Sequence, residues 1–146
     1  MIRIVTDSTC DLPQETIRKY DIRVVPLYIN IGDKGYLDGV EITRQEFYRN
    51  LPTYPVQPTT AASSPEKYRT VYETLAREGA TEILSIHISV ALSAVVNTAR
   101  IAAQETKTIP VTVFDSRQLS LGTGFLVETA ARLAAQGRSM GEIVAV

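Results

Sequence analysis

Residues 64–88 read Ser-Pro-Glu-Lys-Tyr-Arg-Thr-Val-Tyr-Glu-Thr-Leu-Ala-Arg-Glu-Gly-Ala-Thr-Glu-Ile-Leu-Ser-Ile-His-Ile, and they predict a helix followed by a buried strand. Ser64 is a typical N-cap, and Pro65 fits the first helical position. Apolar side chains then recur at i, i+3, i+4 and i+7, and Gly79 is expected to end the helix. The four residues of this apolar stripe are Tyr68, Val71, Tyr72 and Leu75.

Strands and helices alternate on both sides of this unit. Strands are predicted at residues 2–6, 22–31, 82–88 and 109–114, with a hairpin arm ending near residue 37. Asp11 is expected to cap a helix that ends near residue 20, and Thr43 opens a capping box. This order predicts an α/β fold, a mostly parallel sheet with helices on both faces and a short β-hairpin. Two later helices are expected, one with Leu92, Val95, Val96, Ala99 and Ala102 facing inward and one bearing Phe125, Leu126, Ala130 and Leu133.

Composition excludes several classes of protein. The chain has 146 residues, 45% of them hydrophobic, and its formal net charge is −1. Without a basic excess, binding to nucleic acid through phosphate neutralisation is not expected. No apolar run approaches the ~18 residues of a membrane-spanning helix. The single cysteine, Cys10, fits a reducing compartment, so a cytoplasmic location is expected.

The last residues predict the start of another element. Ser139 and Glu142 form a capping box, and the apolar residues after them begin a helix face. Helices this short are marginal by themselves. We therefore expect residues 1–138 to be an N-terminal α/β domain, and residues 139–146 to begin a helix leading toward a C-terminal domain absent from this chain. A short docking helix is the alternative interpretation.

Hydroxyl groups and glycines follow the predicted strands. In open parallel sheets ligands bind beyond the carboxyl ends of the strands, and helix N-termini there favour anions and polar head groups. Helix capping is the alternative role for each single hydroxyl. Arg117 is the one cation among these segments, so a triphosphate is a poor fit. The candidate residues are Ser8, Thr9, Ser89, Ser93, Asp115, Ser116, Ser120 and Gly122, together with the loop at residues 58–64.

Catalytic motifs are scarce in this sequence. His87 is the sole histidine and lies near the end of a strand, where a structural role is favoured over that of a general base. Nucleophile-elbow and S-x-x-K motifs are absent. One histidine and one cysteine offer no metal-ligand cluster, so no metal is expected. Binding is therefore favoured over catalysis, with a small serine hydrolase using Ser93 or Ser116 as the less favoured alternative.

With these motifs in view, the sequence resembles the DegV family of bacterial fatty-acid-binding proteins along its whole length. The segment 5–12, Val-Thr-Asp-Ser-Thr-Cys-Asp-Leu, is similar to the family's opening V-T-D-S-T-x-D-L. Further matches are V-V-P-L at 24–27, Y-x-D-G at 36–39 and P-T-T at 58–60. The segments at 85–93 and 115–124 are similar to S-I-H-I-S-S-x-L-S and D-S-x-x-x-S-x-G-x-G.

The resemblance implies a Rossmann-like domain that binds one long-chain fatty acid and needs no cofactor. The family presents the acyl carboxylate to a fatty-acid kinase for phospholipid synthesis. By motif, Thr60 and Ser93 would bind the carboxylate, with Thr59 and Ser89 as neighbours of lesser claim. Transient contact with a membrane surface and self-association through an exposed apolar face are further expectations. The alternative is a structural or interaction module that keeps the fold without the ligand.

Two candidate loops differ from the family pattern. Residues 60–63 read Thr-Ala-Ala-Ser where the family has T-S-Q-P, and residues 89–95 read Ser-Val-Ala-Leu-Ser-Ala-Val where it has S-S-x-L-S-G-T. Polar side chains are lost in both loops. Ala94 replaces a glycine, which restricts the backbone beside the proposed carboxylate. The expected fold is unaffected by these changes.

Overall fold

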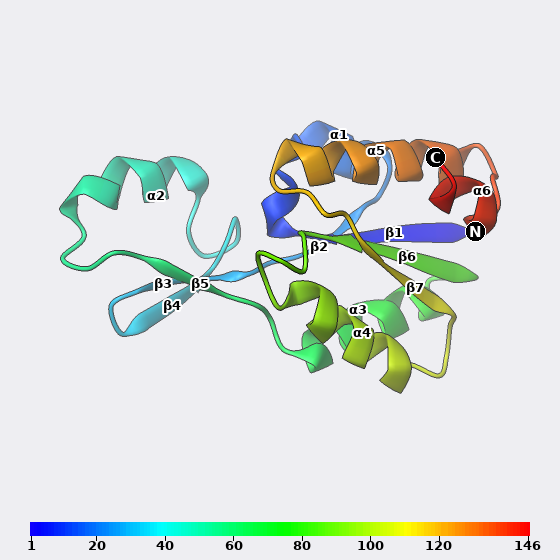
Figure 1. Cartoon of the computed structure of the whole chain (residues 1–146), viewed down its shortest axis with the longest axis horizontal. Helices are drawn as coiled ribbons and strands as arrows, with labels where there is room; N and C mark the ends of the chain where they lie inside the picture. The colour runs from blue at the N-terminus through cyan, green and yellow to red at the C-terminus, as the bar shows by residue number, and fades with distance from the viewer.

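The computed structural model describes residues 1–146, and a parallel four-stranded sheet forms the centre of its body (Figure 1). The strand order is β2-β1-β6-β7, so the first strand lies in the interior of the sheet. Both neighbours of β1 run parallel to it, as does β7 to β6, which confirms the predicted α/β fold. The strands are β1 (Ile2–Asp7), β2 (Arg23–Val25), β6 (Glu82–His87) and β7 (Val111–Asp115).

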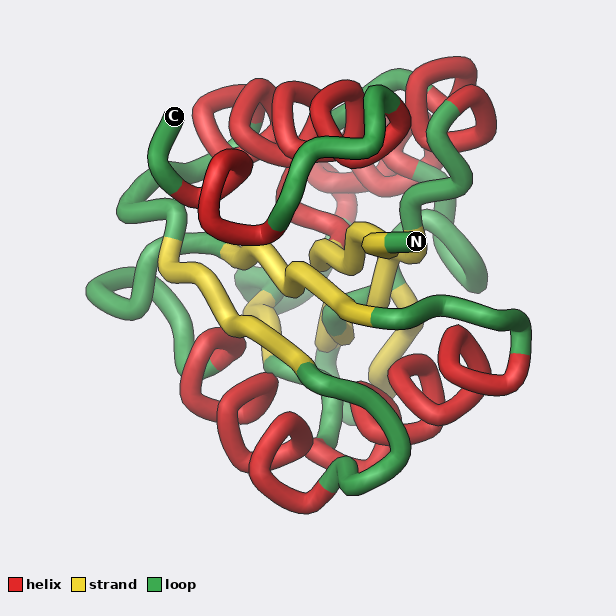
Figure 2. Tube along the Cα trace, turned by 90° about the vertical axis from the view of Figure 1, so that its right-hand side faces the viewer, coloured by secondary structure: helices red, strands yellow, loops and turns green.

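Helices cover both faces of this sheet, as the sequence predicted (Figure 2). On one face lie α3 (Pro65–Arg77) and α4 (Val95–Glu105). On the other lie α1 (Gln14–Lys19), α5 (Leu121–Ala135) and the short α6 (Met140–Val144). The body is therefore a three-layer sandwich.

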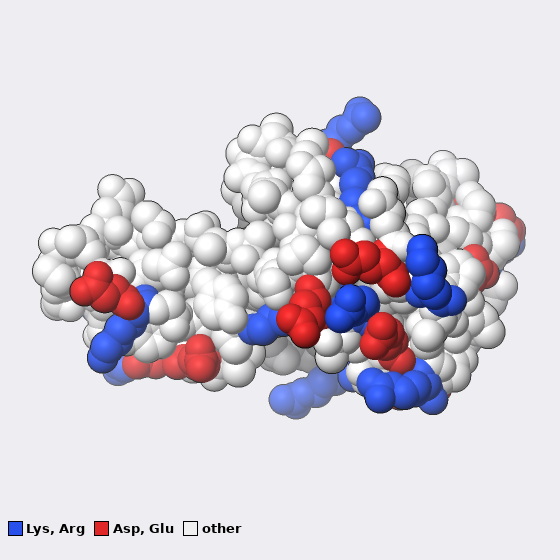
Figure 3. Space-filling view, turned by 90° about the horizontal axis from the view of Figure 1, so that it is seen from below, with Lys and Arg blue, Asp and Glu red and all other residues white.

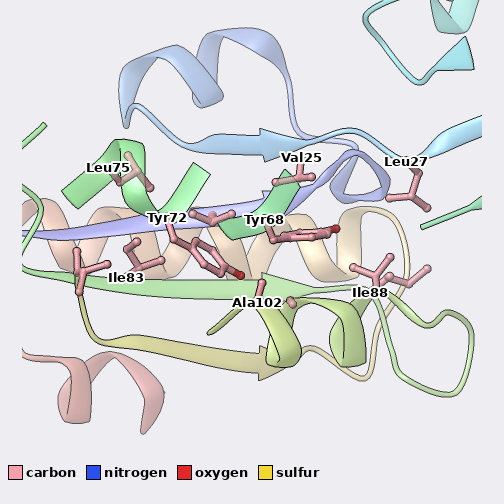
Figure 4. Close-up of a cluster of buried hydrophobic side chains, with 12 residues drawn as sticks. Val25, Leu27, Tyr68, Tyr72, Leu75, Ile83, Ile88 and Ala102 are labelled. Atoms are coloured by element: carbon pink, nitrogen blue, oxygen red, sulfur yellow. The ribbon is translucent and has the colours of Figure 1, made fainter. Parts of the chain in front are cut away.

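The apolar stripe of α3 packs on the sheet as predicted. Tyr68, Tyr72 and Leu75 are fully buried, while Val71 is partly buried. They join strand and α4 residues in one cluster of 12 buried side chains (Figure 4). Burial of a large apolar side chain contributes about 1.5–3 kcal/mol, so this cluster is a main source of stability.

A second cluster joins the opposite face of the sheet to α1, α5 and α6. Gly124 allows α5 to approach the 3₁₀ turn Ser8–Cys10, because a Cβ at this position would lie 2.4 Å from the carbonyl oxygen of Cys10. Ser139 and Glu142 form the predicted capping box of α6. Ile143 is buried in the cluster, so α6 docks on the body.

A smaller unit, which we call the arm (residues 28–61), extends from the body (Figure 1). Its antiparallel sheet has the order β4-β3-β5. The predicted hairpin is confirmed, and Thr43 caps α2 by accepting a hydrogen bond from the backbone N–H of Glu46. The arm contains β3 (Tyr28–Ile31), β4 (Lys34–Leu37), α2 (Arg44–Asn50), a 3₁₀ turn (Leu51–Thr53) and β5 (Thr59–Ala61).

Two sequence predictions near the arm were wrong. The predicted strand 22–31 is divided at Pro26 between β2 of the body and β3 of the arm, because proline cannot donate a ladder hydrogen bond. Asp11 does not cap α1, whose N-cap is Pro13. Asp11 adopts a left-handed backbone conformation, and its carboxylate pairs with Arg44 and Ser120 instead.

Two side chains, those of Leu92 and Ser64, also differ from expectation, and Phe125 is exposed on the helix predicted to bear it. Leu92 lies before α4 and is 61% exposed, although it was expected to face inward. Phe125 on α5 is equally exposed. Ser64 stands at the N-cap of α3, but its side chain makes no capping hydrogen bond. The apolar residues among these are therefore available at the surface.

Charges of both signs are interspersed on the face of the molecule that carries α3 and α4 (Figure 3). Ion pairs such as Arg69 with Glu105 join neighbouring elements. None of the helices combines the length and apolar character that crossing a membrane requires.

Candidate functional site

The carboxyl ends of the parallel strands meet at one edge of the body sheet, and this edge faces the arm (Figure 1). The 3₁₀ turn Ser8–Cys10 follows β1, residues 88–94 follow β6 and residues 116–120 follow β7. These segments carry most of the candidate residues. The parallel topology therefore brings them to a common edge, as predicted.

Asp7 lies beneath this edge and joins two of the segments. One carboxylate oxygen accepts hydrogen bonds from the backbone N–H and the hydroxyl of Thr9, at 3.0 and 2.5 Å. The other accepts from Nδ1 of His87 at 3.0 Å and from the backbone N–H of Ile88 at 3.1 Å. Asp7 is fully buried, and its four donors replace the water that burial removes. It therefore fixes the ends of β1 and β6 relative to each other.

His87 continues this network into the core. Its Nε2 lies 2.7 Å from the hydroxyl of Ser85, which lies 2.8 Å from the hydroxyl of Tyr72. An ionised carboxylate only accepts hydrogen bonds, so Nδ1–H of His87 donates to Asp7, and hydrogen bonds then link Nε2 of His87 to Ser85 and Ser85 to Tyr72. We call Asp7, His87, Ser85 and Tyr72 the buried polar chain.

The buried polar chain supports the structural interpretation of His87. Asp7, His87 and Ser85 have the hydrogen-bond order of a hydrolase triad, but all three side chains are fully buried, so substrate does not reach them. Both ring nitrogens are engaged by Asp7 and Ser85. His87 therefore does not activate Ser93 or Ser116, and the geometry opposes the hydrolase alternative.

The pKa values of Asp7 and Tyr72 in the buried polar chain follow from these contacts. Burial by itself would raise the pKa of Asp7, but the hydrogen bond and electrostatic attraction of His87, together with the hydrogen bonds from Thr9 and Ile88, hold this pKa below its usual value. Burial raises the pKa of Tyr72 to about 12, and the hydrogen bond with Ser85 offsets only part of that rise. Asp7 is therefore an anion and Tyr72 a neutral hydroxyl at physiological pH.

Several candidate hydroxyls are used within the protein. The Ser8 hydroxyl accepts from the backbone N–H of Leu27 at 3.1 Å, and that of Ser89 accepts from Ala91 at 3.2 Å. Ser116 is buried and lies 3.0 Å from the hydroxyl of Thr123. Such pairing leaves these groups less free to bind a ligand.

The loop between β7 and α5 is held in shape by its own polar groups. Asp115 accepts hydrogen bonds from the backbone N–H groups of Val90 and Arg117, at 3.2 and 3.0 Å, and so ties this loop to the one after β6. Ser120 has φ 56° and ψ −134°, a conformation that strains a non-glycine residue, and donates a hydrogen bond to Asp11. Gly122 lies against Gln118, where an added Cβ would come within 2.9 Å of the amide oxygen.

Thr60 and Ser93 differ from these paired hydroxyls. Thr59 and Thr60 are exposed in β5 of the arm, where Thr60 is opposite Ile29 of β3. Ser93 is half-buried just before α4, and its hydroxyl oxygen has only a long contact of 3.4 Å with the backbone N–H of Val95. No hydrogen bond joins Thr60 to Ser93. Each hydroxyl retains a free donor for a ligand.

Arg44 supplies a second cation at the edge, which the sequence analysis missed. It reaches from α2 of the arm to Asp11 and donates a hydrogen bond to the carbonyl of Ser8 at 2.6 Å. A carboxylate oxygen of Asp38 lies 3.9 Å from the guanidinium of Arg44. Two pockets of about 480 and 230 Å³ flank this cluster, and both are lined by Asp11, Asp38 and Arg44. Because its charge is already paired, Arg44 fastens the arm to the body.

Apolar side chains are exposed on the segments that follow β6 and β7. Residues of this kind come from the loop after β6, from the loop after β7 and from the first turns of α5. Their fractional exposures lie between 42% and 61%. An edge with free hydroxyls and exposed apolar side chains matches the two ends of an amphipathic ligand. The apolar residues are Val90, Leu92, Leu119, Leu121 and Phe125.

The missed residues left weak signals in the sequence. Ser85 and His87 are two apart in a strand, so their side chains share one face, and that face meets the tyrosines of α3. Arg44 gave no signal, since its partners are 33 and 6 residues away along the chain. No group of three or more His, Cys, Asp or Glu side chains is arranged to hold a metal ion.

Comparisons with known proteins match the full length of the chain. The model of the family described as "Uncharacterised protein, DegV family" matches residues 1–146. A DegV domain-containing protein of Clostridium perfringens is 39% identical over 142 residues, which is 97% of this chain and 50% of that relative. The chain thus spans about half the length of the curated relatives it matches.

Solved structures are similar to the whole of this chain. A DegV family protein from Thermus thermophilus, described as fatty acid binding, has 42% identity and a TM-score of 0.89, covering 99% of this chain and 51% of its own. A stearic acid-binding protein from Eubacterium ventriosum has 29% identity and a TM-score of 0.88, covering 99% of this chain and 51% of its own. Both correspond to the body and the arm together.

Proposed function

Because the chain belongs to the DegV family, we propose that it binds a long-chain fatty acid at the edge where the body meets the arm. The hydroxyls of Thr60 and Ser93 donate to the carboxylate. The acyl tail lies along the exposed apolar side chains of the segments that follow β6 and β7. The observation that carries this proposal is that Ser93, whose hydroxyl is free to donate, and exposed apolar side chains lie at the edge of the body sheet that faces the arm, where Thr60 is exposed in β5.

Ser93 is suited to a carboxylate by its place before α4. That helix has 11 residues, its N-cap Ala94 has no capping side chain, and its first turn contains no acidic residue. Only the hydroxyl oxygen of Ser93, 3.4 Å from the backbone N–H of Val95, offsets the positive end of the helix dipole. An anion beside Ser93 gains both the hydroxyl and the free N–H groups of the first turn.

The two ends of the ligand contribute differently. Burial of the tail is worth about 0.8 kcal/mol per methylene, which reaches ~10 kcal/mol for a long chain before the costs of association. A hydrogen bond to a charged group contributes roughly 1.5–3 kcal/mol. The tail therefore sets the affinity, while Thr60 and Ser93 set the orientation and prevent the carboxylate from being desolvated without a partner.

Substitution of the two hydroxyls tests this proposal. We expect Ser93→Ala and Thr60→Ala each to weaken stearate binding by about tenfold, measured by calorimetry on delipidated protein. Thr112→Ala is the matched control, because Thr112 is exposed in β7 and lies outside the loops of the edge. Binding that is unchanged in both site variants would contradict the assignment.

A fatty-acid kinase is the proposed consumer of the bound acid. A carboxylate held at an exposed edge is accessible to a second protein. The kinase requires this access to transfer a phosphoryl group to the carboxylate and form an acyl phosphate. We expect the loaded protein to support ATP-dependent acyl phosphate formation by such a kinase, with Ser93→Ala reducing the rate at low stearate. If no wild-type stearate complex forms and the protein has a defined oligomeric state, the alternative of a structural or interaction module is favoured.

The domain organisation is also proposed. Residues 1–138 contain the body and the arm, and residues 139–146 contain α6, which would lead toward a C-terminal domain.

Val144 and Val146 are exposed beside an apolar pocket of about 270 Å³ on α5. This is the face through which we expect self-association, which sedimentation of a Val144→Asp variant would test.

A further inference from the structure

Two tyrosines one helical turn apart on α3 differ in how their hydroxyls are paired. Tyr68 and Tyr72 are both fully buried in the same cluster. The hydroxyl of Tyr72 is hydrogen-bonded to that of Ser85, at 2.8 Å, in the buried polar chain. The hydroxyl of Tyr68 has no hydrogen-bond partner. A buried, unpaired hydroxyl destabilises a protein, and phenylalanine would fill the same space without that penalty.

The Tyr68 hydroxyl points toward the candidate site. In Figure 4 it is directed along the strands toward the end of the cluster where Leu27 and Ile88 lie, away from Leu75. The ring packs edge-on against His87, with the ring centroids 5.4 Å apart. Ile88 begins the loop that carries Ser93, and Ala62 of the loop after β5 packs on the same cluster. The hydroxyl therefore points toward the end of the cluster where the loop that carries Ser93 begins.

The environment of Tyr68 fixes its role as a hydrogen-bond donor. Burial, together with the negative charge of Asp7, raises the pKa of Tyr68 far above its usual value. The hydroxyl is thus protonated and neutral, with its proton unused. Asp7 is not available as an acceptor, since four other donors already occupy its carboxylate.

We propose that the Tyr68 hydroxyl is a third donor to the carboxylate of the bound fatty acid, reached when the ligand displaces the side chains that cover it. This inference rests on the proposed function and adds a specificity-determining residue to it. A hydroxyl that destabilises the free protein and pairs only in the complex favours the bound state. Tyr68 therefore lowers the stability of the empty domain and raises its affinity for the acid.

Substitution of each tyrosine by phenylalanine separates this role from a structural one. In the delipidated 146-residue protein, we expect Tyr68→Phe to raise the urea midpoint of unfolding and Tyr72→Phe to lower it. For stearate, measured by calorimetry, Tyr68→Phe is expected to weaken binding by about tenfold, while Tyr72→Phe leaves it within about twofold. Octadecanol, which has the same tail without a carboxylate, is expected to bind wild type and Tyr68→Phe equally.

The outcomes separate this inference from the proposed function. If Tyr68→Phe binds stearate as wild type does while Ser93→Ala binds it weakly, the role of Tyr68 is wrong and the site stands. Equal losses for stearate and octadecanol, or a lower urea midpoint for Tyr68→Phe, would also overturn the inference. Failure of the wild-type protein to bind stearate would overturn both proposals.

Discussion

The buried polar chain and the edge above it contain the same kinds of residue, yet they serve different purposes. Asp7, His87, Ser85 and Tyr72 are fully buried, and each is hydrogen-bonded to the next. Thr60 is exposed and Ser93 is half-buried, and neither has a strong partner. The comparison teaches that pairing and burial, rather than residue type, decide whether a hydroxyl stabilises the fold or remains free for a ligand.

Substitution of Asp7 is expected to have the largest effect on stability. Asp7→Ala leaves the N–H groups of Thr9, His87 and Ile88 buried without their acceptor. Removing one partner of a buried, charged network typically costs about 3–5 kcal/mol. Urea unfolding of the variant measures this loss. A loss below about 1 kcal/mol in the free energy of unfolding would show that the buried polar chain does not hold β1 and β6 together.

A matched carboxylate gives the control for this prediction. Asp33 is exposed in the turn between β3 and β4. Asp33→Ala is expected to change the free energy of unfolding by no more than about 0.5 kcal/mol. The two variants remove the same side chain from a buried network and from the surface. A large loss at Asp7 and a small one at Asp33 would show that burial and pairing, not residue type, set the cost.

Removal of the Ser85 hydroxyl, in the middle of the buried polar chain, is expected to have an intermediate effect on the free energy of unfolding. Ser85→Ala leaves Nε2 of His87 and the hydroxyl of Tyr72 unpaired in the core, which costs about 1–3 kcal/mol. In a double-mutant cycle with Tyr72→Phe, the combined loss should be smaller than the sum of the two single losses. Additive losses would mean that the two hydroxyls are not coupled.

The pH dependence of stability is expected to show the smallest effect. The folded-state pKa of Asp7 is below its unfolded value, so its stabilisation is complete above the unfolded pKa and is lost as the pH falls through the folded one. The free energy of unfolding of the wild type should therefore decline below about pH 4. Asp7→Asn should decline less steeply over the same range in urea titrations. If the free energy of unfolding falls equally steeply with pH in both proteins, Asp7 is not the source of the acid sensitivity.

Much of the body was predictable because its signals are local. The stripe from Tyr68 to Leu75 placed α3 on the sheet, and the capping boxes at Thr43 and Ser139 located the starts of α2 and α6. Periodicity and capping involve residues within a few positions of one another. The strand at 22–31 was misjudged because its division at Pro26 depends on which sheet each half joins.

The site was predictable only in outline. Parallel topology follows from the order of elements, and it placed the loops with Ser8, Ser89 and Ser116 at one edge. Which hydroxyls are already paired there depends on neighbours distant in sequence, such as Leu27 for Ser8. The contact between Arg44 and Asp11 is of the same kind. Such contacts have no sequence period to reveal them.

The amino-acid sequence by itself determined the α/β architecture and the edge at which polar residues gather, because both depend on the local period of apolar side chains and on the order of the elements. Tertiary structure alone decided that His87 is enclosed between Asp7 and Ser85, and that Tyr72 is paired while Tyr68 is not. The physical reason is that a polar group's role depends on the distance to its partners and on the exclusion of water, and both are fixed only when remote segments pack together.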